Sequence, residues 1–144
     1  MNRTALISAA LAGILAFTSV PAFANGISIY QHGWANEAGG AQNGFHNNIG
    51  VHQEGRRNSA VAHQNGRRNT AAIGQQGRRH SATTVQTGRD NAAGVAQFGQ
   101  RHNATIVQDG NGNIAAGVQV GRNCDGSVSQ TGNGNVAAFV QTCH

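Results

Sequence analysis

The chain has 144 residues and a formal charge of +5, with only 10% charged residues and 21 glycines. Its few large apolar side chains exclude a thick hydrophobic core, and Asn/Gln-rich composition of this kind often signals disorder. The five acidic residues are scattered and form no paired carboxylates or Ser/His/Asp grouping, so we expect no enzyme and no cofactor. The regular spacing of the polar residues along the chain argues against simple disorder.

The first 24 residues resemble a secretory signal peptide. Arg3 supplies a positive start, residues 5–20 are apolar, and the small-x-small pattern at residues 22–24 predicts cleavage between Ala24 and Asn25. About 16 apolar residues is short for a membrane span, and no stop-transfer flank follows. We therefore expect an exported, soluble, single-domain mature chain of residues 25–144 without a membrane span.

Glutamine then recurs every 11 residues without a register slip. A period this short indicates a repeat architecture, in which each unit is too small to fold alone and must stack on its neighbours. The glutamines are Gln31, Gln42, Gln53, Gln64, Gln75, Gln86, Gln97, Gln108, Gln119, Gln130 and Gln141. A glycine stands two residues after each of the first ten, at Gly33, Gly44, Gly55, Gly66, Gly77, Gly88, Gly99, Gly110, Gly121 and Gly132.

Each unit has one inward-facing set of residues. Counted from glutamine, position five is Asn, His or Cys, position seven is mostly Ala, and position nine is often Val, Ile or Phe. These positions share a parity with the next glutamine, so in a strand they point to one face. The four residues between Gln and Asn, with Gly second, can reverse the chain. Each unit is predicted to be one short strand and one turn.

An 11-residue period also suits a right-handed supercoil of helices, but a glycine in every unit and many Asn, Val, Thr and Ile residues disfavour it. Two units are instead predicted to complete a 22-residue rung of an all-β solenoid with two stacked parallel sheets. Eleven strands give about five and a half rungs, a cross-β stack ~26 Å tall.

Buried amides in such a stack should bond to their copies one rung away, because an unpartnered buried amide costs ~1–3 kcal/mol. Besides the glutamines, this self-assembly core ladder is predicted to contain Asn47, Asn58, Asn69, Asn91, Asn113 and Asn135. Position five in the alternate units runs Asn36, Asn58, His80, His102 and Cys124 instead.

All arginines after residue 24 fall three or four residues after a glutamine. Stacking places Arg56, Arg57, Arg78, Arg79, Arg101 and Arg122 on one edge and Arg67, Arg68 and Arg89 on the other. We interpret them as a solvated gatekeeper rail that restrains runaway pairing through like-charge repulsion. The alternative is an edge that binds extracellular polyanions such as DNA or anionic polysaccharide.

Two further pairs of side chains are candidates for a metal site and a disulfide. His80 and His102 are 22 residues apart and should stack inside, but no further ligands join them, so we expect no metal site. Cys143 should lie above Gly121, in the turn that leads to Cys124, which makes a Cys124–Cys143 disulfide plausible in an oxidising compartment. Two free thiols are the alternative.

The repeat resembles the curlin repeat of bacterial curli fibres, Ser-x5-Gln-x-Gly-x-Gly-Asn-x-Ala-x3-Gln. Two turns, at residues 108–113 and 130–135, match the family's turn letter for letter, whereas the family's opening Ser is Asn, His or Cys here. In that frame a half-repeat at residues 25–35 precedes five repeats at 36–57, 58–79, 80–101, 102–123 and 124–144.

The resemblance implies a structural subunit of an extracellular functional amyloid, a fimbrium-like fibre that supports cell adhesion and biofilm. It implies self-association, a curli major subunit or nucleator as partner, and outer-membrane secretion machinery reached through the periplasm. The alternative is a monomeric secreted β-solenoid that binds glycan, polyanion or ice. An outward threonine array would favour that alternative, but Val61 and Ser127 flank Thr83 and Thr105 in their column.

Overall fold

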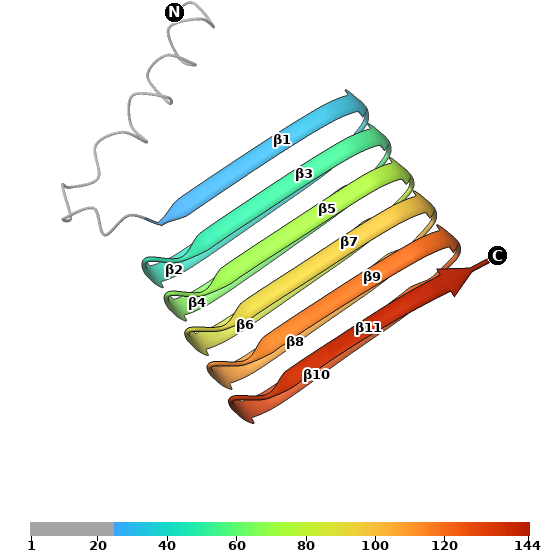
Figure 1. Cartoon of the computed structure of the whole chain (residues 1–144). Helices are drawn as coiled ribbons and strands as arrows, with labels where there is room; N and C mark the ends of the chain where they lie inside the picture. The colour runs from blue at the N-terminus through green and yellow to red at the C-terminus, as the bar shows by residue number, and fades with distance from the viewer. Residues whose placement is uncertain (1–24) are drawn as a thin grey trace, which may run out of the picture.

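The computed structural model describes residues 25–144, so the predicted signal peptide lies outside the described residues. Within that range the chain is a ladder of strands joined by tight turns (Figure 1). No described segment forms a helix long and apolar enough to cross a membrane. The strands are β1 (Gly26–Trp34), β2 (Glu37–Phe45), β3 (Asn48–Arg56), β4 (Ser59–Arg67), β5 (Thr70–Arg78), β6 (Ser81–Arg89), β7 (Ala92–Gln100), β8 (Asn103–Asn111), β9 (Ile114–Arg122), β10 (Asp125–Asn133) and β11 (Val136–Cys143).

The strands alternate between two parallel sheets. One sheet has the order β1-β3-β5-β7-β9-β11 and the other β10-β8-β6-β4-β2. Each strand pairs with the strand two further along, 22 residues away, so that Gln53 lies beside Gln75 and Gln64 beside Gln86. The predicted β-solenoid of 22-residue rungs is confirmed.

The strands are longer and the turns shorter than the sequence analysis predicted. Each of the first ten strands continues through its glutamine and glycine, and only two residues separate it from the next strand. The glycine φ is positive, as expected (Gly55, 119°), but it bends the chain while the pairing with Gly77 continues. A Cβ at Gly55 would lie 1.9 Å from the Gly77 carbonyl oxygen, so no other residue fits there.

The space between the sheets is filled by small and β-branched residues. Ala60, Ala82 and Ala104 line one sheet, and Ile49 and Ile73 line the other, all at most 2% exposed. Buried amides flank this core at both ends of each strand, as the inward parity predicted. The core is thin, and polar contacts along the axis therefore carry much of the specificity of the stack.

Candidate self-assembly site

The glutamines form two continuous hydrogen-bonded ladders. In each, the Nε2 of one glutamine donates to the Oε1 of the glutamine one rung further on, at 2.6–2.9 Å, as from Gln53 to Gln75 and from Gln75 to Gln97. The inner members are buried, and Gln97 and Gln108 are 0% exposed. Every donor lies at the lower residue number and every acceptor at the higher one. Each ladder therefore has a donor end and an acceptor end.

The second Nε2 hydrogen of each glutamine from Gln42 onward ties the two sheets together. It donates to a main-chain carbonyl 16 residues earlier, as from Gln53 to Glu37 and from Gln75 to Ser59, at 2.8 and 2.9 Å. Both donors of a buried glutamine are thus used, one along the axis and one across the rung. Removing such a side chain breaks both links.

The position-five asparagines follow a different scheme from the amide-to-amide ladder that we expected. The Oδ1 of Asn47 accepts the main-chain N–H of Asn69, at 3.1 Å. The Nδ2 of Asn47 donates to the carbonyl of Asn43 and to that of Gly66, 19 residues further on. Each asparagine therefore bonds to the backbone of its copy, because it lies in the turn, where main-chain groups lack strand partners.

Asn25 and Asn36 make these contacts too, although the predicted ladder omitted them. The 11-residue period alone identifies both positions. The turns between even and odd strands form what we call the asparagine edge, whose position-five residues are Asn25, Asn47, Asn69, Asn91, Asn113 and Asn135. The opposite turns form the mixed edge, with Asn36, Asn58, His80, His102 and Cys124.

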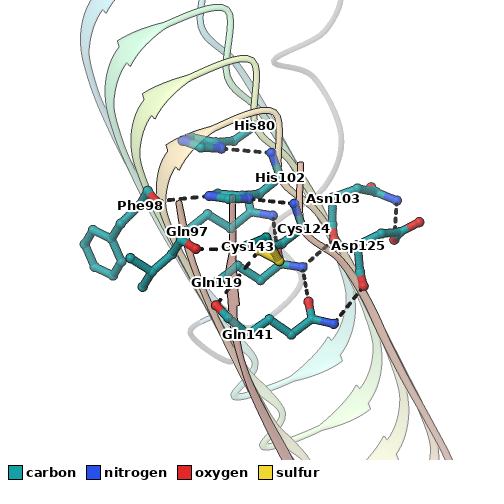
Figure 2. Close-up of a disulfide and its surroundings, with 11 residues drawn as sticks. His80, Gln97, Phe98, His102, Asn103, Gln119, Cys124, Asp125, Gln141 and Cys143 are labelled. Carbon is teal, nitrogen blue, oxygen red and sulfur yellow. Dashed lines mark hydrogen bonds between the residues drawn. A yellow bond between two sulfur atoms is a disulfide. The ribbon is translucent and has the colours of Figure 1, made fainter. Parts of the chain in front are cut away.

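At the mixed edge, two histidines reproduce the asparagine contacts (Figure 2). His80 Nδ1 accepts the N–H of His102 at 3.3 Å, and His102 Nδ1 accepts the N–H of Cys124 at 3.1 Å. The Nε2 atoms of His80 and His102 lie 3.2 and 3.0 Å from the carbonyls four residues earlier. Since each Nδ1 is an acceptor, each ring must be neutral with its proton on Nε2. The rings stack with centroids 5.0 Å apart.

The surroundings of His80 favour this neutral form. Burial holds the pKa of His80 below its ordinary value of 6.5, and the adjacent His102 acts in the same direction. Hydrogen bonds to the carbonyls of Gln76 and Gly99 oppose the shift without cancelling it. Protonating Nδ1 would also destroy the acceptor that holds the next rung.

The Cys124–Cys143 disulfide takes the place of one asparagine-type hydrogen bond at the mixed edge. Asparagine Nδ2 bonds to a glycine carbonyl 19 residues later, and the structure joins Cys124 to Cys143, also 19 residues later. Their Cα atoms are 5.6 Å apart, and Cys143 lies beside Gly121 as the register predicts. At the last rung of the mixed edge a covalent bond thus replaces a hydrogen bond.

The arginines lie along both edges. Arg56 pairs with Arg78 on the mixed edge, and Arg67 pairs with Arg89 on the asparagine edge. A groove on the mixed edge is lined by Trp34, Ala35, Arg56, Arg57, Arg78, Arg79, Gln100 and Arg101, and no acid is among them. On the asparagine edge, by contrast, Arg68 Nε forms a 2.9 Å ion pair with Asp90 of the next rung.

Both ends of the described stack are open. The inward-facing Ile27 and Ile29 of β1 are 48% and 43% exposed, whereas the equivalent Ile49 is fully buried. Within residues 25–144, the buried Gln42 Oε1 has no hydrogen-bond partner. At the other end, Gln141 Nε2 donates only to the Asp125 carbonyl, which leaves its second hydrogen for a further rung. One end offers ladder acceptors and the other offers ladder donors.

None of the described residues forms a group of three or more His, Cys, Asp or Glu side chains suited to a metal ion. The outward threonines lie in the column that the sequence predicted, with Val61 and Ser127 on either side of Thr83 and Thr105. The interrupted column offers no flat array of hydroxyls. The geometry therefore directs attention to the ladders and to the open ends.

Parallel rungs, continuous amide ladders and a thin core define the protein as a cross-β solenoid built from 11-residue units. Curlin-associated repeats match residues 24–55, 47–77, 66–99 and 81–110, which together span more than half of the chain. The chain belongs to the curlin repeat family, a family of structural rather than enzymatic proteins that form extracellular curli fibres. No individual curated protein is similar enough to the chain to count as a match.

Proposed function

We propose that this protein is a structural subunit of an extracellular functional amyloid fibre, which grows by addition of copies at the strand edges and supports adhesion and biofilm. The observation that carries the proposal is the complementarity of the two open ends. Head-to-tail addition of a unit with matching ends does not close, so it produces a filament.

Three features of the ends support growth. The exposed core residues Ile27 and Ile29 would be buried by an added rung, which is favourable by ~25 cal/mol per Å² of apolar surface. The unpartnered Oε1 of Gln42 would gain a donor. The main-chain groups along the outer edges of β1, β2, β10 and β11 would gain strand partners.

The arginine edges belong to the same proposal. Like charges on stacked turns repel, so the two rows of arginines would slow uncontrolled strand pairing between chains and keep fibres apart. The acid-free groove beside Trp34 favours a second role, in which the mixed edge binds an extracellular polyanion. Binding of heparin or DNA to the assembled fibre, lost in an Arg57→Ser/Arg79→Ser variant, would test that role separately.

The export signal and the secretion partners are also part of the proposal. Cleavage after Ala24, passage through the periplasm and an outer-membrane secretion channel, and contact with a curli major subunit or nucleator fit the family. Sequencing the N-terminus of the exported chain tests the cleavage: a mature chain that begins at Asn25 is expected.

The self-assembly role is tested by fibre formation from purified variants. Gln53→Ala and Asn58→Ala remove buried ladder contacts, as do the equivalent changes at Gln119 and Asn113, and should slow assembly strongly. Matched controls are Thr70→Ala and Ser59→Ala, whose side chains point outward. Equal effects of the inward and outward changes would show that the ladder does not drive assembly.

A further inference from the structure

The described stack contains an odd number of strands, and this constrains how two copies can meet. Six strands form one sheet and five form the other, so the first and last strands, β1 and β11, belong to the same sheet. Beyond β11, the next free strand position along the axis lies in the opposite sheet, on top of β10. A copy added without rotation would place its β1 on β11 and leave that position empty.

We propose that successive copies in the fibre are related by a half-turn about the fibre axis, so that β1 of each new copy pairs with β10 and its β2 pairs with β11. This inference rests on the proposed function. The two sheets are interchangeable at such a junction because all eleven strands follow the same 11-residue pattern, and the first ten share the positive-φ glycine that Cys143 replaces in β11. The half-turn repeats, between copies, the relation that already links each strand to the next within the chain.

The glutamine ladders are completed only in this arrangement. Gln130 Nε2, which donates only to the Ile114 carbonyl, would meet Gln31 Oε1 of the next copy. Gln141 Nε2 would meet the buried, unpartnered Gln42 Oε1 of that copy. Without rotation, β10 and the next copy's β2 would lie ~10 Å apart, twice the normal strand spacing. The main-chain groups and glutamine amides on the facing sides of these two strands would then lack partners.

The packing of Phe139 favours the same junction. Its ring occupies the space that Cβ atoms would take at Gly117 and Gly126, so this large side chain needs glycine neighbours. The half-turn places Gly40 of the next copy beside Phe139, where an inward position without a side chain leaves room. Without rotation, the neighbour would be Ile29, a bulky side chain directly against the ring.

Directed cross-linking distinguishes the two arrangements. Val140 is 76% exposed, and Ala41 and Tyr30 also point outward. Fibres are grown from a mixture of the Val140→Cys and Ala41→Cys chains, and separately from Val140→Cys and Tyr30→Cys chains. After mild oxidation, mass spectrometry identifies the linked peptides. Each variant grown alone is the control for exchange with the native cysteines.

The half-turn predicts a 140–41 cross-link and none above the control level between residues 140 and 30, because only the first pair lies on adjacent strands. A 140–30 product, alone or beside the 140–41 product, overturns the half-turn while leaving fibre formation intact. A purified chain that forms no fibres overturns both proposals.

Helical reconstruction of fibres of the unsubstituted chain gives a second measurement that depends on no variant. The half-turn predicts a rise of ~26 Å per copy, five and a half rungs, with a rotation of ~180°. A rise of ~29 Å, six rungs, without that rotation contradicts it.

Discussion

The asparagine edge and the mixed edge use one contact scheme with different chemistry. At the first, every position-five residue is an asparagine, which accepts an N–H from the next rung and donates to main-chain carbonyls. At the second, neutral His80 and His102 do the same, and the Cys124–Cys143 bond replaces one link. The hydrogen-bonded form of this position thus requires a neutral acceptor and donor at the right separation rather than an amide.

This difference has a consequence for the conditions that each edge tolerates. Asparagine neither titrates nor forms covalent bonds between rungs, so the position-five contacts of the asparagine edge should be insensitive to pH and redox state. The mixed edge depends on an unprotonated imidazole and on an oxidised cysteine pair. The asparagine edge therefore serves as the internal reference for changes made at the mixed edge.

The largest effect is expected from truncating a central glutamine at either edge. Gln97→Ala, near the mixed edge, leaves one Nε2 hydrogen of Gln75 and the Oε1 of Gln119 without partners, and Gln86→Ala does the same in the other ladder. Two buried polar groups without partners, at ~1–3 kcal/mol each, predict a loss of ~2–6 kcal/mol in the free energy of unfolding. Denaturant unfolding of both variants measures it. Clearly unequal losses would break the claim that the edges share one scheme.

The disulfide should matter next. Replacing Cys124 and Cys143 by serine removes a link that closes a 19-residue separation, which predicts a loss of ~3 kcal/mol. The free energies of unfolding of the serine variant and of the reduced parent chain should agree, since both lack the disulfide. Mass spectrometry of the exported chain without reductant provides the direct check. Two cysteines that alkylate freely there would refute the bond in the mature protein.

A pH effect on the position-five contacts should be confined to the mixed edge. The folded pKa of His80 lies below 6.5, so the unfolded state binds more protons below about that pH. The stability that neutral His80 contributes is complete above pH ~6.5 and is lost as the pH falls through that value toward the folded pKa. Stability and assembly rate should therefore both decrease in acid.

His80→Asn/His102→Asn restores asparagine at both positions and should flatten this part of the pH dependence. The exposed histidines, such as His52 and His63, are the same in both chains and cancel in the comparison. A pH profile between 5 and 8 that is identical in the parent and the double variant would contradict the assignment.

The smallest effect concerns the arginines. Like charges ~5 Å apart in water repel by ~0.8 kcal/mol, and salt partly screens them, so assembly should accelerate with ionic strength or added polyanion. Arg79→Ser, on the acid-free groove, should weaken this salt dependence more than Arg68→Ser, because Arg68 is paired with Asp90. Fibrillation kinetics at several salt concentrations measure the difference. Equal salt slopes would remove the distinction between the edges.

The period and parity of the sequence predicted the main features of the fold because each unit repeats the same environment. The register of Gln53 beside Gln75, the burial of the alanines and the position of Cys143 beside Gly121 follow from counting residues. The two arginine edges follow in the same way. Repetition makes long-range contacts visible as a short period.

The turn geometry could not be read from the sequence. Arg57 and Arg79 have φ values of 57° and 60°, although arginine does not favour that region. Stacking imposes it: the N–H of Arg79 donates to the Arg56 carbonyl of the preceding rung. The bonding of asparagine to backbone rather than to asparagine has the same origin. Both depend on tertiary contacts that local propensity does not contain.

Fibre X-ray diffraction from the purified chain tests the central claim most directly, that the amide ladders continue from one copy into the next. The account predicts spontaneous fibres with a sharp meridional reflection at ~4.8 Å and an equatorial reflection at ~10 Å. A chain that remains folded and monomeric, even when seeded with fragments of its own aggregates, would contradict it.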